Sequence, residues 1–279
     1  MLERSMDHHH SLVLDDGAEI RWSLLGQNRA SGTATTTPVV LIHGITETAE
    51  AWKPVADRLG STRQVLTLDM RGHGQSSRVP PYDLGTMAAD VINVITSAGI
   101  EPPHIVGHSL GGAVASVVGA TGIGRSVVCV DQSLQLAMFS AMLNEVESAL
   151  RDPASFGQVV AMLFDQLMGD RLPSKERARL AALREPDQDV VLGVWSVLFE
   201  ASPEEITTAV DDSIAGYVSN PTPYLALFGA EPGGDYHPWL QHRIPSAQVE
   251  VWDGHDHYPH LLDPDRFVAR LERFWETDS

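Results

Sequence analysis

Short apolar runs alternate along the chain with segments of helical periodicity. Near the amino-terminal end, apolar residues occupy every second position at Leu12 and Leu14, and again at Ile20, Trp22 and Leu24, on either side of an Asp-Asp-Gly turn. This pattern predicts a β-hairpin. Later apolar runs are "PVVLIH", "QVLTLD", "PHIVGHS", "SVVCVD", "PYLALFG" and "AQVEVWDG". Their order predicts an α/β fold, in which a mainly parallel twisted sheet is flanked by helices on both faces.

The alternation stops between the fourth and the fifth of these later runs. Residues 132–218 carry helical patterns, and the stretch is too long for a plain connection between two strands. The expected helices cover residues 136–150, 155–168, 174–183, 187–201 and 203–217. The last of them begins with a Ser-Pro-Glu-Glu capping box. We interpret residues 132–218 as a helical cap inserted into a core domain that consists of residues 1–131 and 219–279.

The composition limits the kinds of partner and the cellular compartment that we expect for this protein. The 279 residues are 43% hydrophobic, which is enough for a sizeable core. The formal net charge of −18 disfavours nucleic acid and anionic membrane surfaces as partners. The one cysteine, Cys129, cannot form an internal disulfide, and the sequence shows neither a signal-peptide pattern nor an apolar run of membrane-spanning length. We therefore expect a cytoplasmic protein, and homo-oligomerisation remains open.

The stretch "IVGHSLGGA" carries the strongest chemical signal. Gly107, Ser109 and Gly111 satisfy the pattern G-x-S-x-G directly after an apolar run and before a helix-compatible one. Such a turn holds its serine in a strained conformation, and glycines flank it because a side chain there would collide with neighbouring backbone. We expect the Ser109 hydroxyl to be exposed above the sheet edge as a nucleophile. The alternative is a purely structural turn.

From this motif outward, the chain resembles the α/β-hydrolase fold family, and especially its serine esterases and lactonases with a helical cap. The segments "VVLIHGITETAEAW" and "LTLDMRGHGQSS" are similar to the family's oxyanion loop and to its next strand and loop. The resemblance implies that the backbone N–H groups of Ile45 and Leu110 form an oxyanion hole while Ser109 forms an acyl-enzyme. Losing one such donor typically costs about 3 to 4 kcal/mol of transition-state stabilisation. We expect no cofactor and no metal.

A serine nucleophile needs a base, and the histidine-rich stretch "GHDHYPH" supplies the candidates. In the family, the base follows the last strand in a turn that resembles Gly-x-Gly-His. The best match places Gly254 at the first glycine and His257 at the base. Asp256 stands where the second glycine is usual, a departure that could change the course of the loop. His255 is therefore kept as a second candidate.

The same histidines also allow a metal hypothesis. His255, His257 and His260 are close in sequence, and so are His8, His9 and His10. Either group could ligate zinc. Three neighbouring histidines without a thiolate or a fixed carboxylate specify a metal site weakly, so we favour the base.

The carboxylate that would orient His257 has three candidates in the chain order serine, acid, histidine. By the resemblance, the usual position lies in a turn after "PYLALFG", where Pro232 stands in place of the acid, with Glu231 one residue early and Asp235 three residues late. An alternative family position, at the end of "VVCVD", supplies Asp131. We predict Asp131, because a rigid strand end holds catalytic geometry better than a glycine-rich loop. Its competing role is to cap the turn out of the strand.

Apolar side chains at helical spacing within 132–218 indicate the substrate class. They are Met138, Met142, Met162, Phe139, Phe164, Trp195 and Phe199. Most should form the core of the cap, while a methionine-rich remainder should line a cleft for a small apolar ester or lactone. Serine disfavours epoxide hydrolases and dehalogenases, whose nucleophile is aspartate. Thioesterases, carbon–carbon bond hydrolases, perhydrolases and weakly catalytic binding or signalling proteins share the motifs and remain alternatives.

Overall fold

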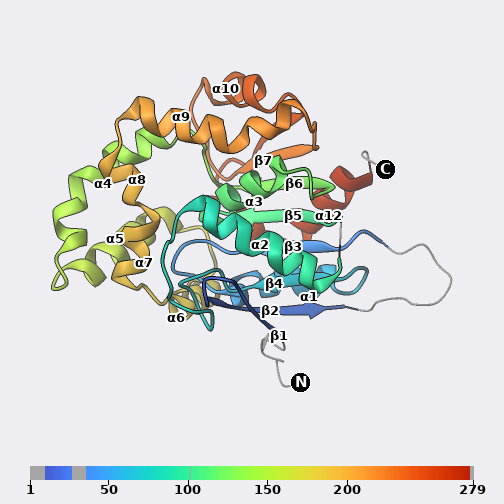
Figure 1. Cartoon of the computed structure of the whole chain (residues 1–279), viewed down its shortest axis with the longest axis horizontal. Coiled ribbons are helices and arrows are strands. Elements are labelled where there is room, and N and C mark those ends of the chain that lie inside the picture. Colours follow the sequence, from blue (N-terminus) through green and yellow to red (C-terminus); the bar gives the residue numbers. More distant parts are fainter. Residues whose placement is uncertain (1–9, 27–35, 101, 277–279) are drawn as a thin grey trace.

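The apolar runs of the sequence become the strands of one eight-stranded sheet. The computed structural model describes residues 10–26, 36–100 and 102–276 (Figure 1). Five central strands are buried at every position, as their continuous apolar runs predict. In the order in which they pair, the strands are β1 (His10–Val13), β2 (Glu19–Leu25), β4 (Val65–Leu68), β3 (Val39–Ile42), β5 (His104–His108), β6 (Ser126–Val130), β7 (Tyr224–Phe228) and β8 (Ala247–Val251).

The sheet is antiparallel at one edge and parallel elsewhere. β1 and β2 form the predicted hairpin, with Leu12 opposite Ile20, and β2 also runs antiparallel to β4. The remaining strands pair in parallel, so their carboxyl ends meet at one edge of the sheet. The chain passes from β3 outward to β4 and then returns to β5 on the other side of β3. Ligands of open α/β sheets bind at such a reversal of strand order.

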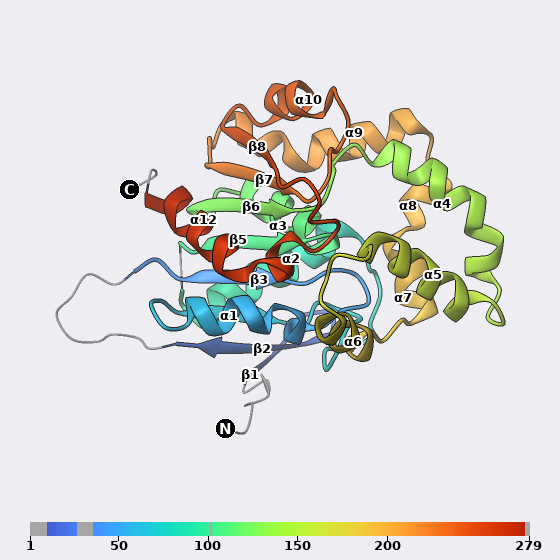
Figure 2. The same cartoon turned by 180° about the vertical axis from the view of Figure 1, so that it is seen from behind.

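Helices cover both faces of the sheet, and each face has its own apolar core. Along β5, Ile105 packs with the helices of one face and Val106 with those of the other, because successive side chains of a strand point to opposite sides. One face carries α2 (Leu84–Ala98), α3 (Leu110–Ala120) and α10 (Tyr236–Arg243). The other face, turned to the viewer in Figure 2, carries α1 (Lys53–Leu59) and α12 (Pro264–Glu276). The short helices η1 (Ala49–Trp52) and α11 (Pro259–Leu262) lie in loops beside them.

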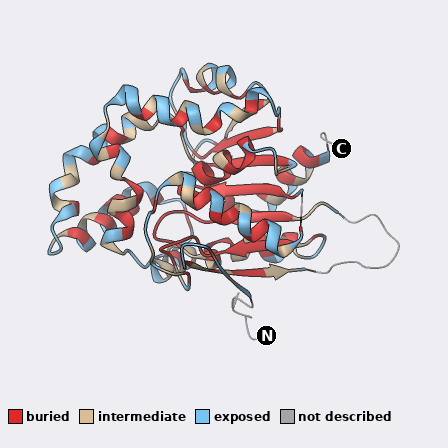
Figure 3. Cartoon of the chain, in the orientation of Figure 1, coloured by how far each residue is buried: buried red, intermediate tan, exposed pale blue. Residues whose placement is uncertain are grey.

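The segment between β6 and β7 is helical and lies beyond the carboxyl ends of the parallel strands (Figure 1). Its helices carry exposed, intermediate and buried residues, whereas the central strands of the sheet are buried (Figure 3). The helices are α4 (Leu136–Arg151), α5 (Phe156–Met168), α6 (Ser174–Leu183), α7 (Gln188–Val194), α8 (Ser196–Glu200), α9 (Pro203–Ile214) and η2 (Ala215–Val218). The capping box of Ser202 and Glu205 is present.

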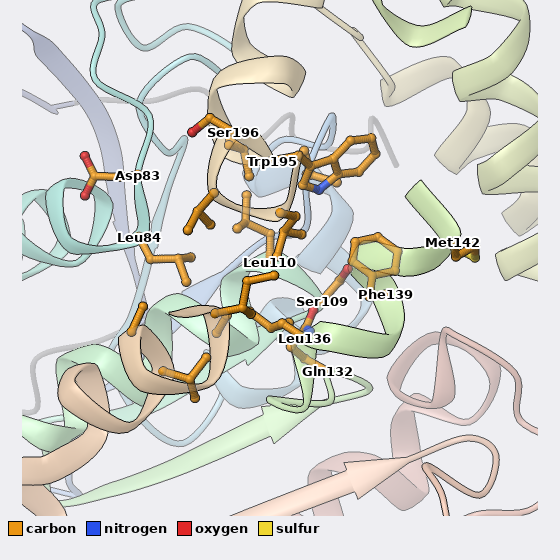
Figure 4. Close-up of a pocket in the computed structure, with 18 of the residues that line it drawn as sticks. Asp83, Leu84, Ser109, Leu110, Gln132, Leu136, Phe139, Met142, Trp195 and Ser196 are labelled. Atoms are coloured by element: carbon orange, nitrogen blue, oxygen red, sulfur yellow. The ribbon is translucent and has the colours of Figure 1, made fainter. Parts of the chain in front are cut away.

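One predicted helix of this segment is wrong. The expected helix over 187–201 is divided into α7 and α8, because Trp195 leaves helical geometry with φ −93° and ψ 5°. The break lets the Trp195 side chain line a pocket (Figure 4). Within the described ranges, no helix combines the length and the apolar character needed to span a bilayer.

Candidate active site

Ser109 lies at the turn between β5 and α3, where the motif predicts it. Its φ of 52° and ψ of −125° place it in a conformation that L-residues rarely adopt. Its N–H donates to the carbonyl of Val130 at 2.9 Å, and its own carbonyl accepts hydrogen bonds from Gly112 at 2.7 Å and Ala113 at 3.2 Å. These bonds tie the strained turn to β6 and to α3, and the serine borders a pocket (Figure 4).

The glycines around Ser109 are required by close backbone packing. A Cβ atom on Gly107 would lie 1.9 Å from the carbonyl oxygen of Gly111, and one on Gly111 would lie 2.2 Å from that of Ile42 in β3. We expect Gly111→Ala to lower the free energy of unfolding by about 3 kcal/mol, because a backbone atom cannot move aside as a side chain can. Denaturant titration would measure the loss.

Gly157 provides the matched control for this substitution. It is an exposed residue of α5, and an added Cβ would meet nothing within 4 Å. Gly157→Ala should therefore raise the free energy of unfolding by up to about 1 kcal/mol through helix propensity. If Gly111→Ala were as stable as the wild-type protein, the packing argument for the serine turn would be wrong.

Asp131 and His257 come together although 126 residues separate them. Asp131 follows β6, and its Oδ2 lies 2.6 Å from Nδ1 of His257 in the loop after β8. Its Oδ1 accepts the N–H of Gly229 at 2.7 Å. Because a carboxylate only accepts, Nδ1 of His257 carries the proton and Nε2 is the basic nitrogen. That Nε2 is buried and has no hydrogen-bond partner within the described ranges.

The other sequence candidates lie outside this pair. Glu231 and Asp235 are exposed, and the carboxylate of Asp235 accepts a hydrogen bond from the Gln135 side chain at 3.4 Å. The ring of His255 packs against Trp252, with 5.5 Å between ring centroids. Of the three acids that the sequence offers, Asp131 is the one that the structure brings to His257.

Asp256 makes a left-handed turn directly in front of His257, at the position where the resemblance leads us to expect a glycine. Its φ is 49°, a left-handed conformation that aspartate tolerates better than most residues. Within the described ranges, positive φ at non-glycine residues occurs at Thr46, Ser109, Asp131 and Asp256. These positions lie in the loop after β3, in the turn at Ser109 (the serine turn), at the end of β6 and in the loop after β8 that carries His257 (the base loop). Backbone strain of this kind concentrates at functional sites.

Gly229 is a site residue that the sequence reasoning missed. Besides donating to Asp131, it leaves no room for a side chain, because a Cβ atom would lie 1.7 Å from the carbonyl oxygen of Asp256. The available signal was a glycine directly after the apolar run "PYLALF". Gly229 thus brings the end of β7 into contact with both Asp131 and the loop that carries His257.

His108 connects the serine turn to the base loop. Its Nε2 donates to the carbonyl of His257 at 2.8 Å, and the two ring centroids are 4.6 Å apart. In the described part of the chain, no hydrogen bond joins Ser109 Oγ to His257. Such contacts are often long in unliganded enzymes and tighten when substrate binds.

The two residues expected at the oxyanion hole border the same pocket as Ser109. Leu110 is the first residue of α3, so its N–H has no acceptor inside the helix and lies at the positive end of the helix dipole. Ile45 precedes Thr46, whose φ of 63° is rare for a β-branched residue. The loop after β3 and the start of α3 therefore bring both residues to the pocket that Ser109 borders.

The pocket has a volume of about 350 Å³ and lies between the sheet edge and the helical segment. Its walls are mainly apolar, and many of the side chains appear in Figure 4. They include Leu110, Leu136, Phe139, Met142, Phe164 and Trp195. The expected methionine-rich lining is wrong, because Met138 and Met162 are on outer faces of α4 and α5, where 79% and 53% of their surfaces are exposed.

The remaining histidines are arranged differently from metal ligands. His260 is buried 4.5 Å from the Trp52 ring, and burial together with nearby His108 lowers its pKa well below the usual value. His8 and His9 lie outside the described residues, and the ring of His10 stacks on a tryptophan of β2. Among the described residues, no three histidine, cysteine or acidic side chains converge as a metal site would require.

Comparison with known proteins identifies relatives of the whole chain. Residues 39–270 match the sequence profile of the Alpha/beta hydrolase family. An uncharacterized protein of Mycobacterium tuberculosis is 28% identical over 277 residues, which cover 90% of this chain and 79% of that protein. The sn-1-specific diacylglycerol lipase ABHD11 of Danio rerio is 25% identical over 257 residues, with 87% of this chain and 80% of the lipase covered.

A solved structure shows the same fold. The enol-lactonase from Burkholderia xenovorans LB400 superposes with a TM-score of 0.66 at 17% identity, and the match covers 96% of this chain and all of the lactonase. At this identity the likeness establishes a shared fold.

Proposed function

This chain belongs to the alpha/beta hydrolase family, and from that premise we propose that it is a serine hydrolase that cleaves a neutral, apolar carboxylic ester or lactone. The observation that carries the proposal is the contact between Asp131 and His257 beside the strained Ser109 at an apolar pocket. Similarity to a diacylglycerol lipase and to an enol-lactonase supports the substrate class, because both names denote cleavage of an acyl–oxygen bond.

The proposed reaction has two halves, and in each of them His257 first accepts a proton and then gives it up. His257 Nε2 accepts the proton of Ser109 as the hydroxyl oxygen attacks the carbonyl carbon, and Asp131 stabilises the imidazolium. The N–H groups of Ile45 and Leu110 donate to the oxyanion. His257 then protonates the leaving alkoxide, which leaves an acyl-enzyme on Ser109. Water, deprotonated by His257, attacks that ester, and His257 returns the proton to Ser109 Oγ as the acid leaves.

We also propose that residues 132–218 act as a cap on a core formed by residues 1–131 and 219–279. The pocket draws its walls from both parts, since Leu110 and Ala113 of α3 line it together with Phe139 of α4 and Phe164 of α5. Closing such a site excludes water and strengthens the electrostatic interactions inside it.

The polar lining explains why the substrate should be neutral. Among the described residues that line the pocket, Asp83 is the titratable one, and its carboxylate already accepts the N–H and the hydroxyl of Thr86 at 2.9 and 2.7 Å. Ser196 and Ser213 donate their hydroxyl protons to carbonyls of their own helical segment. A negatively charged substrate group would therefore lose its water and find no cationic partner among these side chains.

We expect p-nitrophenyl hexanoate to be hydrolysed with a kcat/KM about 100-fold higher than that of mono-p-nitrophenyl adipate, which has the same chain length and a terminal carboxylate. Burying the unpaired carboxylate would cost several kcal/mol. Initial rates for both esters at neutral pH would measure the ratio. Equal values would contradict the neutral-substrate assignment, and absence of turnover of every ester and lactone in a wider panel would contradict the proposed class.

A further inference from the structure

A buried carboxylate that the proposed reaction does not use lies behind the site. Glu47 belongs to the loop after β3, and 3% of its side chain is exposed. Its Oε2 accepts the N–H of Gly44 at 3.1 Å, and its Oε1 accepts the hydroxyl of Tyr258 at 2.7 Å. Gly44 directly precedes Ile45, and Tyr258 directly follows His257. One carboxylate thus joins the proposed oxyanion loop to the base loop.

The same carboxylate also borders the serine turn. Nδ1 of His108 lies 3.6 Å from Glu47 Oε2, and the two groups form an ion pair when this ring is protonated on both nitrogens. The other nitrogen of His108 is 2.8 Å from the carbonyl of His257 and must carry a proton, because a carbonyl oxygen can only accept. His108 directly precedes Ser109. All three loops that carry the proposed reacting groups therefore meet at Glu47.

An arginine extends this connection into the helical segment. Arg184, between α6 and α7, donates from Nη2 to the hydroxyl oxygen of Tyr258 at 2.8 Å. Its guanidinium lies over the ring of Phe164 with 4.4 Å to the ring centroid, and Phe164 lines the pocket. The next residue, Glu185, donates its N–H to the carbonyl of Thr46 at 3.0 Å.

Glu47 is held in its charged form. Burial alone would raise its pKa, but nearby His108 and the hydroxyl of Tyr258 keep the pKa well below the usual range of a glutamate. A buried charge is retained where its partners are fixed in place, because any displacement of them leaves it uncompensated. The network is therefore sensitive to the positions of all the loops that supply those partners.

We propose that Glu47 is a positioning residue that fixes the positions of the oxyanion loop, the serine turn and the base loop relative to one another. Through Tyr258 and Arg184, these relative positions also depend on the position of the helical segment. The inference rests on the proposed serine hydrolase function. It assigns no chemical step to Glu47, Tyr258 or Arg184.

The test replaces Tyr258 by phenylalanine, which removes one hydroxyl and keeps the ring against His108 and His260. With p-nitrophenyl butyrate as probe, kcat should fall on the order of 10- to 100-fold while KM stays within about 2-fold, because misplacement affects the transition state more than binding. The rate constant for labelling of Ser109 by a fluorophosphonate should fall by a similar factor. Tyr217→Phe is the matched control. Tyr217 is also buried, and its hydroxyl donates to the carbonyl of Ser116 over a distance of 3.0 Å. Neither residue lines the pocket. Tyr217→Phe should keep kcat within about 2-fold.

Arg184→Met supplies a second test that does not require a buried substitution. It should also lower kcat with little change in KM, and the double variant with Tyr258→Phe should be no slower than Tyr258→Phe alone, because both changes break one connection. Two outcomes would overturn the inference: a normal kcat and normal labelling in both single variants, or a double variant whose kcat falls by the product of the two single effects. In either case, labelling of the wild-type protein would still support the proposed function. A wild-type protein that neither labels nor turns over the ester would overturn both.

Discussion

Replacing Ser109 by alanine is expected to lower kcat for p-nitrophenyl hexanoate by about a million-fold, because no other group could form the acyl-enzyme. The substitution removes one oxygen at the pocket wall and leaves the backbone bonds of the turn to Val130 and Gly112 in place. The variant should therefore unfold at a temperature within a few degrees of the wild-type protein. Steady-state kinetics and thermal unfolding measured on one preparation would check both statements.

Ser196→Ala is the control for this experiment. Ser196 lines the same pocket from α8, and its hydroxyl donates to the carbonyl of Gly193 at 2.9 Å. Its removal should change kcat by no more than a few-fold. The wild-type protein should also keep its activity in the presence of a chelator. Activity that survived Ser109→Ala and disappeared with the chelator would instead favour a metal hydrolase built on the histidines.

Asp131→Asn should lower kcat by about ten-thousand-fold with folding intact. Asparagine can keep the hydrogen bond from Gly229 through its amide oxygen, which turns its NH₂ group toward Nδ1 of His257. Nδ1 would then have to accept, so the proton would move to Nε2 and the base would be in the wrong tautomer. The loss should fall mainly on kcat, and KM for a small ester should change little.

Glu231→Gln and Asp235→Asn test the alternative positions of the acid. Both residues are exposed, and the sheet geometry keeps their carboxylates out of the pair that Asp131 forms with His257. Each should retain kcat within about 2-fold of the wild-type value. If Asp131→Asn were nearly as active as the wild-type protein and one of these variants were inactive, the acid would belong to the loop after β7.

The fold was largely predictable because its signals are local. Continuous apolar runs are typical of strands buried on both faces, and they predicted the mainly parallel sheet that the structure has. The division between α7 and α8 was not predictable, since the residues around Trp195 keep an apolar periodicity through the break. That break depends on what the tryptophan packs against, which no local pattern encodes.

The site was predictable in part for the same reason. The turn at Ser109 is encoded within five residues, whereas the partner of His257 depends on which strand ends come close together. Asp131, Glu231 and Asp235 were all compatible with the chain order, and the distance of 2.6 Å between Asp131 and His257 distinguishes Asp131 from the other two. The roles of Glu47 and Arg184 could not be read from sequence at all, because their common partner, Tyr258, lies in a different loop.

The central claim, an activated serine at position 109, is tested most directly by a fluorophosphonate. The purified protein would be incubated with the reagent, its intact mass measured and the labelled peptide sequenced. We predict one adduct per chain, located on Ser109, absent from Ser109→Ala and strongly slowed in Asp131→Asn. A folded protein that carried no adduct would contradict the claim and leave a binding protein of the same fold as the better account. An adduct on any other residue would contradict it as well.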